Sequence, residues 1–376
     1  MSILKNLVSK CKFAISIISV LLIRMILIFI PKKKYWVIME RGVDARDNGY
    51  FFYKYMKDNH PEKKVYYIIN KSSADYHKVK EDAVETYSLK YYWVVFTCEK
   101  YISTHFNSII PYLYKYRNLT GIYKKYYFLQ HGVIKDFMPS LCKKSFSPKL
   151  FVCGAYPEYK YIHDTFGHDD GVVKYTGLAR FDNLHDFKTK RQILVMPTWR
   201  QNYGAEFEKS DYYKNWNGFL QDKRLEKILD ENNIELIFYP HFEVQKYLDL
   251  FKTDNPRIII ASFKDYDVQA LLKESALLIT DYSSVYFDFA YMKKSVIYFQ
   301  FDKEHFFKYH YQKGYFNYKN MGFGKVCEIT DDVITQIEEI ISRDLQINDF
   351  YLKRTQDFFP LHDMQNCQRI YNEIVK

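Results

Sequence analysis

Two histidines follow apolar runs, one in each half of the chain. His131 comes directly after YYFLQ and before Gly132, and His241 ends the run IELIFYPH. A histidine at the carboxyl end of a parallel strand faces the sheet edge where ligands bind, and its pKa suits a general base near neutral pH. A lone histidine is more often only a hydrogen-bonding residue. The corresponding positions of these two predict that both face one cleft, where Gly132 leaves room for a substrate.

The segment ITDYSSVYFDFAYMKKSVIYFQFD, residues 279–302, predicts a strand, a polar turn, a helix and a second strand. With Asp281 as the N-cap, Ser283 and Ser284 would fall in the first helical turn, where free backbone N–H groups favour a phosphate. Asp288 lies one turn after Ser284 on the same face, so its carboxylate would orient that hydroxyl or hold a ribose. The alternative is that these residues only cap the helix.

Two further stretches carry candidate binding residues. LVMPTWR ends a strand with Thr198 and Arg200, and the planar guanidinium of Arg200 would grip a diphosphate unless it forms a surface ion pair. TGLARFDNL, at 176–184, contains Arg180 and Asp182, which would either brace an interdomain hinge or contact a ligand.

The loop ERGVDARDNG, residues 40–49, closes the first predicted strand at the start of a helix. It lacks the GxGxxG spacing and therefore does not predict a dinucleotide site. Its Arg46 and Asp47 are candidates for contacting an acceptor or for a hinge. No acidic cluster demands a metal and no cofactor is required, although a divalent ion bound with a diphosphate is left open.

The elements that would position these residues alternate along the chain. Strand-like apolar runs separated by helical or loop segments, such as the amphipathic stretch 48–59, lie at 35–39, 65–69, 101–105, 126–129, 150–153 and 172–175. After the polar stretch HDFKTKRQ (185–192) the alternation restarts, with helices at 219–232 and 267–274 and strands at 193–196, 234–239, 257–260, 276–280 and 296–299. This alternation predicts an α/β fold of two doubly wound, Rossmann-like domains, which bind ligands at the carboxyl ends of their strands. The predicted domains are 35–184 and 193–330, followed by a helical tail at 331–376.

The N-terminal segment, residues 1–34, predicts contact with a membrane. Residues 13–30, FAISIISVLLIRMILIFI, form an apolar run with lysines on both sides. No small-residue cleavage site follows, which disfavours a secretory signal. The run is short for a span of ~20 residues and contains Arg24, so an interfacial helix on an anionic surface fits at least as well as a single anchor. The alternative is a core helix of the first domain.

Composition narrows the classes of partner. The chain of 376 residues is 48% hydrophobic, which excludes wholesale disorder. The net charge of +10 favours anionic partners, but the charges are scattered and show no helix-turn-helix or zinc-finger spacing, so nucleic acid is not a predicted partner. The six cysteines form no CxxC pair, which is typical of reduced thiols in the cytosol.

Taken together, four stretches resemble the CDP-glycerol glycerophosphotransferase family of teichoic acid and capsule synthesis: QHG at 130–132, GLARFDNL at 177–184, PTWR at 197–200 and TDYSSVYFDFA at 280–290. The resemblance covers about residues 35–320, and ERGVDARDNG is similar to the capsule-type branch. It implies a GT-B fold, a CDP-linked donor held mainly by the second domain and an acceptor reaching the first. It also implies that His131 is the base and that His241 contacts the donor phosphates. The family usually has His-Pro at the second histidine, whereas here Pro240 precedes His241.

The function implied by the resemblance is transfer of glycerol phosphate from CDP-glycerol to a hydroxyl of a lipid-linked saccharide or a growing polyol-phosphate polymer, with release of CMP. His131 would activate the hydroxyl, while Arg200, Ser283, Ser284 and His241 would stabilise charge on the diphosphate. The reaction would take place at the cytoplasmic face of a bacterial cell membrane. The alternatives are a GT-B transferase that uses CDP-ribitol or a nucleotide sugar, and a non-catalytic, membrane-attached anion-binding protein.

Overall fold

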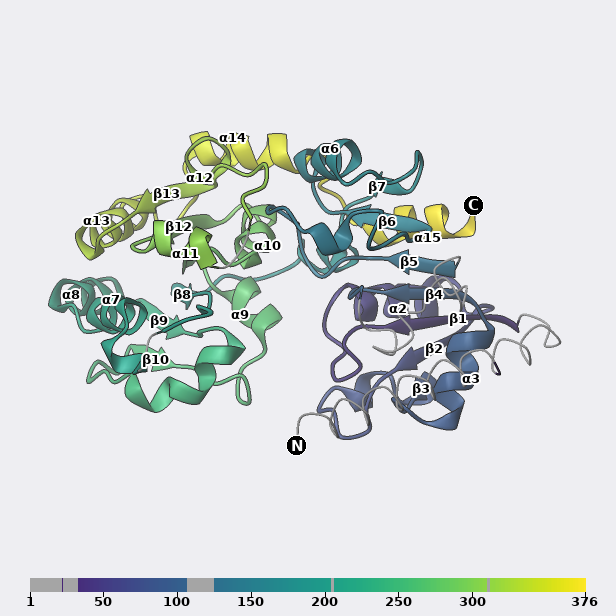
Figure 1. Ribbon diagram of the computed structural model, residues 1–376. Coiled ribbons are helices and arrows are strands. Elements are labelled where there is room, and N and C mark those ends of the chain that lie inside the picture. The colour runs from purple at the N-terminus through teal and green to yellow at the C-terminus, as the bar shows by residue number, and fades with distance from the viewer. Residues whose placement is uncertain (1–21, 23–32, 107–124, 204–205, 310–311) are drawn as a thin grey trace, which may run out of the picture.

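Two parallel sheets form the framework of the protein (Figure 1). The computed structural model describes residue 22 and residues 33–106, 125–203, 206–309 and 312–376. The first sheet has the order β3-β2-β1-β4-β5-β6-β7 and the second has the order β10-β9-β8-β11-β12-β13. In each sheet the strand that comes first in the sequence, β1 or β8, lies inside the sheet, and later strands are added on both sides of it, as in doubly wound folds. The predicted α/β class with parallel sheets is confirmed.

The first unit comprises the elements before the connection at 184–191. Its strands are β1 (Lys33–Met39), β2 (Lys64–Ile68), β3 (Ala83–Val84), β4 (Cys98–Ser103), β5 (Tyr126–Phe128), β6 (Leu150–Cys153) and β7 (Val173–Tyr175). Its helices are α2 (Asn48–Asn59), α3 (Leu89–Thr97) and α6 (Tyr156–Thr165), with 3-10 turns η1 (Tyr76–Lys78), η2 (Lys80–Asp82), η4 (Pro139–Leu141) and η5 (Ala179–Asn183).

The second unit contains β8 (Gln192–Met196), β9 (Glu235–Phe238), β10 (Ile258–Ile260), β11 (Leu277–Thr280), β12 (Ser295–Phe299) and β13 (Gly324–Cys327). Its helices are α7 (Asp211–Leu220), α8 (Lys223–Asn232), α9 (Val268–Glu274), α10 (Val285–Tyr291), α11 (Lys303–Tyr309), α12 (Tyr318–Met321) and α13 (Thr330–Ile341), with η6 (Phe207–Lys209) and η7 (Phe242–Leu250). Helices α14 (Asp349–Phe358) and α15 (Asn366–Val375) follow.

Alternate side chains of the central strands enter different cores, because successive strand residues point to opposite faces. In β1, Val37 packs with the outer core of the first sheet, whereas Ile38 packs with a core that also contains Leu194 of β8. That shared core passes through α10 and η5, and a third core covers the other face of the second sheet. The two units are therefore joined by continuous apolar packing.

Some predicted elements differ from the observed ones. The predicted helix at 219–232 is two helices, because Asp222 accepts a hydrogen bond from the backbone N–H of Arg224 and caps α8. Strands β3 and β13 were not predicted, since one has two residues and the other, GKVC, lacks an apolar run. Lys33 and Lys34 belong to β1 rather than to the N-terminal segment.

The C-terminal helices return to the first unit, as the yellow ribbon in Figure 1 shows. Tyr371 of α15 stacks on His60, with ring centroids 3.7 Å apart, and its ring centroid lies 5.9 Å from that of Trp36 on β1. Asp182 accepts hydrogen bonds from the backbone N–H groups of Asn366 and Cys367, at 2.9 and 2.8 Å, and so fixes the start of α15. The two units are thus connected twice, by residues 184–191 and by the segment leading to α15.

Gly177 allows this second connection to close. Its φ of +77° is a conformation that favours glycine, and an added Cβ would lie 1.8 Å from the side-chain oxygen of Asn366. A side chain at this position would therefore displace the start of α15.

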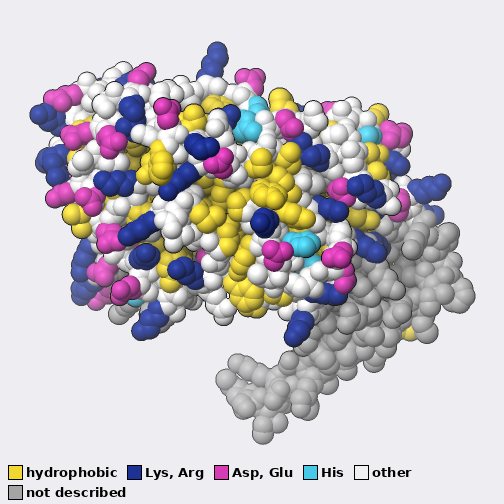
Figure 2. All heavy atoms as spheres, turned by 90° about the horizontal axis from the view of Figure 1, so that it is seen from above, with side chains coloured by type: hydrophobic (Ala, Val, Ile, Leu, Met, Phe, Trp, Pro, Cys, Tyr) yellow, Lys and Arg dark blue, Asp and Glu magenta, His cyan; other side chains and the backbone are white. Residues whose placement is uncertain are grey.

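The membrane prediction concerns residues 1–34, of which 1–21 and 23–32 lie outside the described part of the chain. Within the described part, no helix combines the length and the apolar character that a bilayer span needs. On the face seen in Figure 2, yellow hydrophobic side chains form an area in the middle, and dark blue Lys and Arg and magenta Asp and Glu side chains are intermixed around it.

Candidate active site

Two adjoining cavities between the sheets contain most of the predicted site residues. The larger, of about 510 Å³ and called here the Trp199 cavity, is lined among others by His131, Gly132, Thr198, His241, Ser283 and Ser284. The smaller, of about 210 Å³ and called the Asp47 cavity, is lined among others by Arg46, Asp47, His131, Arg180, Ser284 and Asp288. Because His131 and Ser284 line both, they stand at the junction of the two cavities.

His131 is held by a carboxylate. Its Nδ1 lies 2.5 Å from Oδ2 of Asp47, the residue that precedes α2, while its side chain stays 64% exposed to the cleft. Although burial alone would raise the pKa of Asp47, the charges of His131 and Arg180 lower it below its usual value. An ionised Asp47 favours the tautomer of His131 with its proton on Nδ1, in which Nε2 keeps a free lone pair. This geometry is compatible with the prediction that His131 is a general base.

Arg180 connects the pair of Asp47 and His131 to the second unit. Its Nε and Nη2 donate to the two carboxylate oxygens of Asp288 on α10, at 2.6 and 2.8 Å. Its Nη1 donates to Oδ1 of Asp47 at 2.8 Å and to the backbone carbonyl of His131 at 2.5 Å. Arg180, Asp47 and Asp288 are all buried. Both carboxylate oxygens of Asp288 are therefore already bound to Arg180. To orient Ser284 or hold a ribose, as predicted, Asp288 would have to share these oxygens.

Gly132 lines the Trp199 cavity and faces both units. A Cβ added to Gly132 would meet Nη2 of Arg180 and Oγ of Ser284, each at 3.6 Å, which is ordinary van der Waals contact. The prediction that Gly132 leaves room for a substrate stays a prediction.

The loop that carries Asp47 is fixed by Glu40, which sequence reasoning did not single out. The buried carboxylate of Glu40 accepts hydrogen bonds from the backbone N–H groups of Arg46, Asp47 and Tyr50, at 3.2, 3.0 and 2.7 Å. Gly49 is required beside it, because a Cβ there would lie 2.8 Å from Cγ of Glu40. Burial, reinforced by Asp47 and Asp44, raises the pKa of Glu40 well above its usual value.

His105 is a second residue that the sequence analysis missed. Its ring centroid lies 4.9 Å from that of His131, and it lines both cavities. Burial and then the nearby charge of His131 lower the pKa of His105 to about 4. The sequence pattern that singled out His131 and His241 also applies to His105, which follows an apolar run. His105 was instead included in the predicted strand 101–105, whereas β4 ends at Ser103.

The second unit lines the Trp199 cavity with polar and aromatic groups. His241 precedes η7, its Nδ1 accepts from the backbone N–H of Glu243 at 3.2 Å, and its ring stacks on Trp199 with centroids 6.1 Å apart. Partial desolvation lowers the pKa of His241. Oγ1 of Thr198 is buried and has no hydrogen-bond partner among the described residues, so it is available to a ligand in the cavity.

Arg200 and Asp281 lie behind this lining rather than in it. Arg200 is buried, donates from Nη2 to Asp281 at 2.8 Å, and donates from Nε to Asp302 at 2.6 Å. Asp281 also accepts from the backbone N–H groups of Thr198 and Tyr282. The prediction that Asp281 is the N-cap was wrong, because its carboxylate is used by these groups and α10 begins at Val285, after Ser284.

Two remaining predictions concern Asp182 and metal binding. Asp182 contacts the start of α15 and does not line either cavity. Across the described residues, no group of three or more His, Cys, Asp or Glu side chains is placed to hold a metal ion.

Glu158 supports the loop that carries His131. Its Oε1 accepts from the backbone N–H of Ile134 at 2.5 Å and from Nε2 of Gln130 at 3.1 Å, on the two sides of His131. Its Oε2 accepts from the backbone N–H groups of Gly154 and Ala155, at 2.7 and 3.3 Å. Burial raises the pKa of Glu158 to about 7 against the opposing effect of these hydrogen bonds.

We expect Glu158→Gln to lower the free energy of unfolding by about 2 to 3 kcal/mol at pH 8, where the wild-type carboxylate is ionised. The amide NH₂ would face N–H donors, since both oxygens of Glu158 accept hydrogen bonds. Urea unfolding measures this loss, with Glu231→Gln on the exposed face of α8 as the control. Equal stability of the two variants would show that Glu158 does not hold the loop.

The chain is similar in sequence to known proteins of teichoic acid synthesis. The chain is 32% identical over 369 residues to the minor teichoic acid biosynthesis protein GgaB of Bacillus subtilis (strain 168), covering 92% of this chain and 40% of that protein. It is 25% identical over 383 residues to the teichoic acid poly(glycerol phosphate) polymerase of the same strain, covering 92% of this chain and 49% of the polymerase. The chain therefore spans less than half of the length of these two relatives.

A solved structure with a similar fold is that of the wall teichoic acid polymerase TagF. It has a TM-score of 0.67 and 18% sequence identity, covering 92% of this chain and 90% of the TagF chain. The sequence pattern of the family described as CDP-Glycerol:Poly(glycerophosphate) glycerophosphotransferase matches residues 21–138 and 163–376. These matches confirm the resemblance drawn from the sequence motifs, and the chain belongs to the CDP-glycerol:poly(glycerophosphate) glycerophosphotransferase family.

Proposed function

We propose that this chain transfers glycerol phosphate from CDP-glycerol to a hydroxyl of a lipid-linked or growing teichoic acid or capsule polymer and releases CMP. The observation that supports this most is the pair of Asp47 and His131, because His131 stands where two cavities that are both lined by residues of the two units meet. Membership of the family supports the choice of donor.

The reaction is a displacement at phosphorus. The acceptor hydroxyl gives its proton to Nε2 of His131 while its oxygen forms a bond to the β-phosphorus of CDP-glycerol. The bond between that phosphorus and the bridging oxygen breaks, and CMP leaves with the electron pair. Thr198, His241 and Ser283 line the Trp199 cavity, where the negative charge on the departing CMP would be stabilised.

The buried Arg200 has a different proposed role from direct contact with the diphosphate. Its guanidinium is already bound to Asp281 and Asp302. Because Asp281 also accepts from the backbone N–H of Thr198, Arg200 supports the strand end at which Thr198 would contact the donor. Asp281 contributes to the same support. Both residues would thus act on donor binding through Thr198.

Donor specificity is tested by incubating the purified protein and a short polyol-phosphate acceptor separately with CDP-glycerol, CDP-ribitol and a UDP-sugar. We expect release of CMP with CDP-glycerol and an acceptor extended by one glycerol phosphate. Faster release of CMP from CDP-ribitol would assign the ribitol donor instead, and release of UDP would assign a sugar transferase. No release from any donor would favour a non-catalytic binding protein.

We further propose that residues 1–32 attach the protein to the cytoplasmic face of the membrane. The apolar run flanked by lysines combines hydrophobic burial with attraction to anionic lipid. The segment would attach either as a peripheral helix or as a single anchor. The alternative to attachment is a core helix of the first unit.

Deletion of residues 1–32 should release the protein into the soluble fraction while turnover of CDP-glycerol on a water-soluble acceptor is retained. The deletion leaves β1 intact, since this strand begins at Lys33, and all proposed site residues follow it. Turnover on a lipid-linked acceptor should fall, because a shared surface raises the effective concentration of enzyme and acceptor. Loss of the cooperative thermal transition after deletion would instead identify the segment as part of the core.

A further inference from the structure

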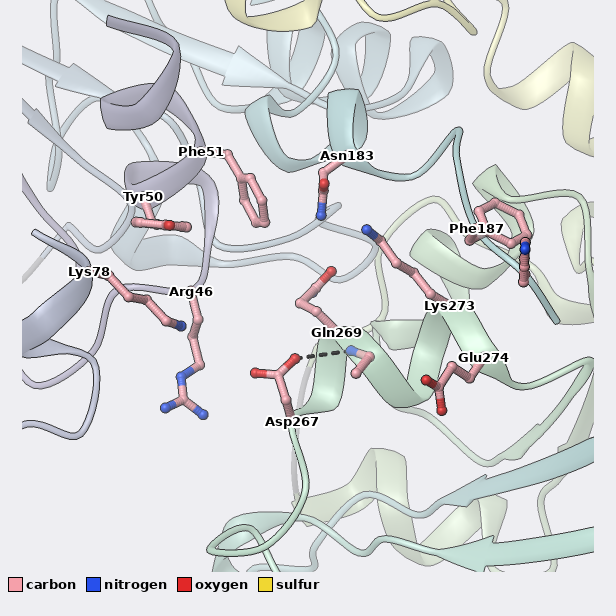
Figure 3. A pocket seen from close by; sticks show the side chains of 12 residues that line it. Arg46, Tyr50, Phe51, Lys78, Asn183, Phe187, Asp267, Gln269, Lys273 and Glu274 are labelled. Carbon is pink, nitrogen blue, oxygen red and sulfur yellow. Dashed lines mark hydrogen bonds between the residues drawn. The ribbon is translucent and has the colours of Figure 1, made fainter. Parts of the chain in front are cut away.

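A third cavity, of about 440 Å³, opens between the two units beside the Asp47 cavity (Figure 3). It is called here the Lys273 cavity, and its lining includes Arg46, Tyr50, Phe51, Asn183, Gln269 and Lys273. Arg46 and Gln269 also line the Asp47 cavity, which in turn shares His131 with the Trp199 cavity. The three cavities therefore follow one another along the cleft, with His131 between the first two.

Cationic groups enter the Lys273 cavity from both units. In Figure 3 the side chain of Arg46 comes from the first unit and ends near Asp267, that of Lys273 comes from α9 and ends near Asn183, and Gln269 lies between them. Arg46 uses Nε to bind Asp75 at 2.7 Å, which leaves the two terminal nitrogens of its fork for another anion. Among the described residues, no carboxylate lies within ion-pair distance of Lys273.

Two acidic residues also line the cavity, and the charge of one of them, Asp267, acts on both Arg46 and Lys273. Asp267 accepts from the backbone N–H of Ala270 at 3.0 Å, which Figure 3 shows as a dashed line, and Glu274 binds Lys190 at 2.6 Å. Partial burial lowers the pKa of Lys273, although the charges of Asp186 and Asp267 oppose this effect. An anion bound beside Lys273 would favour its charged form. The cavity therefore favours an anion between Arg46 and Lys273.

Apolar ring faces accompany these charges. Tyr50 and Phe51 project from α2 toward the cavity, with ring centroids 5.5 Å apart. A polyol-phosphate chain alternates anionic phosphodiesters with short carbon segments, so cations beside aromatic rings suit it. A neutral saccharide would offer no negative charge to Lys273 or to the terminal nitrogens of Arg46.

We propose that the Lys273 cavity binds a phosphodiester of the acceptor chain, next to or one unit behind the hydroxyl that His131 activates. This inference rests on the function proposed above. The donor diphosphate is assigned to the Trp199 cavity, where His241 and Ser283 are found, so an acceptor that reaches His131 has to leave the cleft on the opposite side. That side leads through the Asp47 cavity to Arg46 and Lys273.

The first test is a calorimetric titration of the protein with tri(glycerol phosphate), without any nucleotide. Lys273→Met keeps an unbranched side chain that is one atom shorter and removes its charge, so the dissociation constant should rise about tenfold, the effect of losing one charge-assisted hydrogen bond. Lys264→Met removes a charge that does not line the cavity and should leave the constant unchanged. Equal affinities of wild-type protein and Lys273→Met would overturn the proposal.

The second test separates the two possible sources of phosphate. With CDP-glycerol as donor, Lys273→Met should raise KM for the trimer about tenfold, and leave KM for CDP-glycerol and the turnover at saturating acceptor unchanged. A rise in KM for CDP-glycerol alone would place the donor in this cavity and overturn the proposal. If the wild-type protein binds the trimer through Lys273 but releases no CMP, the acceptor site stands and only the proposed reaction fails.

Discussion

Replacing His131 with alanine should lower the turnover of CDP-glycerol by about 10²-fold or more, the usual effect of losing a general base. The side chain is largely exposed to the cleft, so its removal should not disturb the core. Binding of CDP-glycerol, measured by calorimetry, should stay close to that of the wild-type protein if, as we propose, the donor contacts mainly residues of the second unit. His163→Ala on α6, an exposed histidine beside Asp164, is the matched control.

The partner of His131 provides a second check of the same assignment. Asp47→Asn keeps the shape of the side chain but removes the charge that holds the proton on Nδ1. Turnover should fall with this variant as well, and combining it with His131→Ala should add little, because the two residues act as a unit. Wild-type turnover in His131→Ala would exclude this histidine as the base.

The largest effect on stability is expected for Arg180→Met, at about 3 to 5 kcal/mol, since breaking a buried ion pair leaves carboxylates without a partner. Asp47 and Asp288, which are both buried, would lose their bonds to the guanidinium. Urea unfolding followed by tryptophan fluorescence measures the change. Arg224→Met removes an exposed arginine that also contacts two carboxylates, and should have little effect.

A second variant distinguishes the buried pair from a general loss of packing. Adding Asp288→Met to Arg180→Met removes one of the stranded carboxylates, so part of the lost stability should return. No recovery in the double variant, or a single variant as stable as Arg224→Met, would contradict the described connection between the units.

The fold was largely predictable because most strands are apolar runs and several helices have clear boundaries. The stretch 48–59 was predicted as helical and is α2, and the two sheets follow from the restart of alternation after residue 192. The elements that were missed or merged depend on context: β13 is a strand because it pairs with β12, and the break between α7 and α8 is set by one cap at Asp222.

The candidate site was less predictable, because its main contacts join residues that are far apart in the sequence. Asp47 and His131 are 84 residues apart, and Arg180 and Asp288 are 108 residues apart. Local patterns can place a histidine or arginine at a strand end, but not the carboxylate that it faces. Arg200 illustrates the opposite case, since its position after a strand is compatible with either a ligand or the buried carboxylates that it binds.

The return of α15 to the first sheet has a consequence for the order of events during synthesis on the ribosome. The surface around Trp36 and His60 is covered by Tyr371, which is translated only after the whole second sheet. Until then the first unit exposes apolar area that its own residues do not cover. We therefore expect nascent chains that are stalled before α15 to be sensitive to protease and to bind chaperones, even though every strand of the first sheet has already left the ribosome.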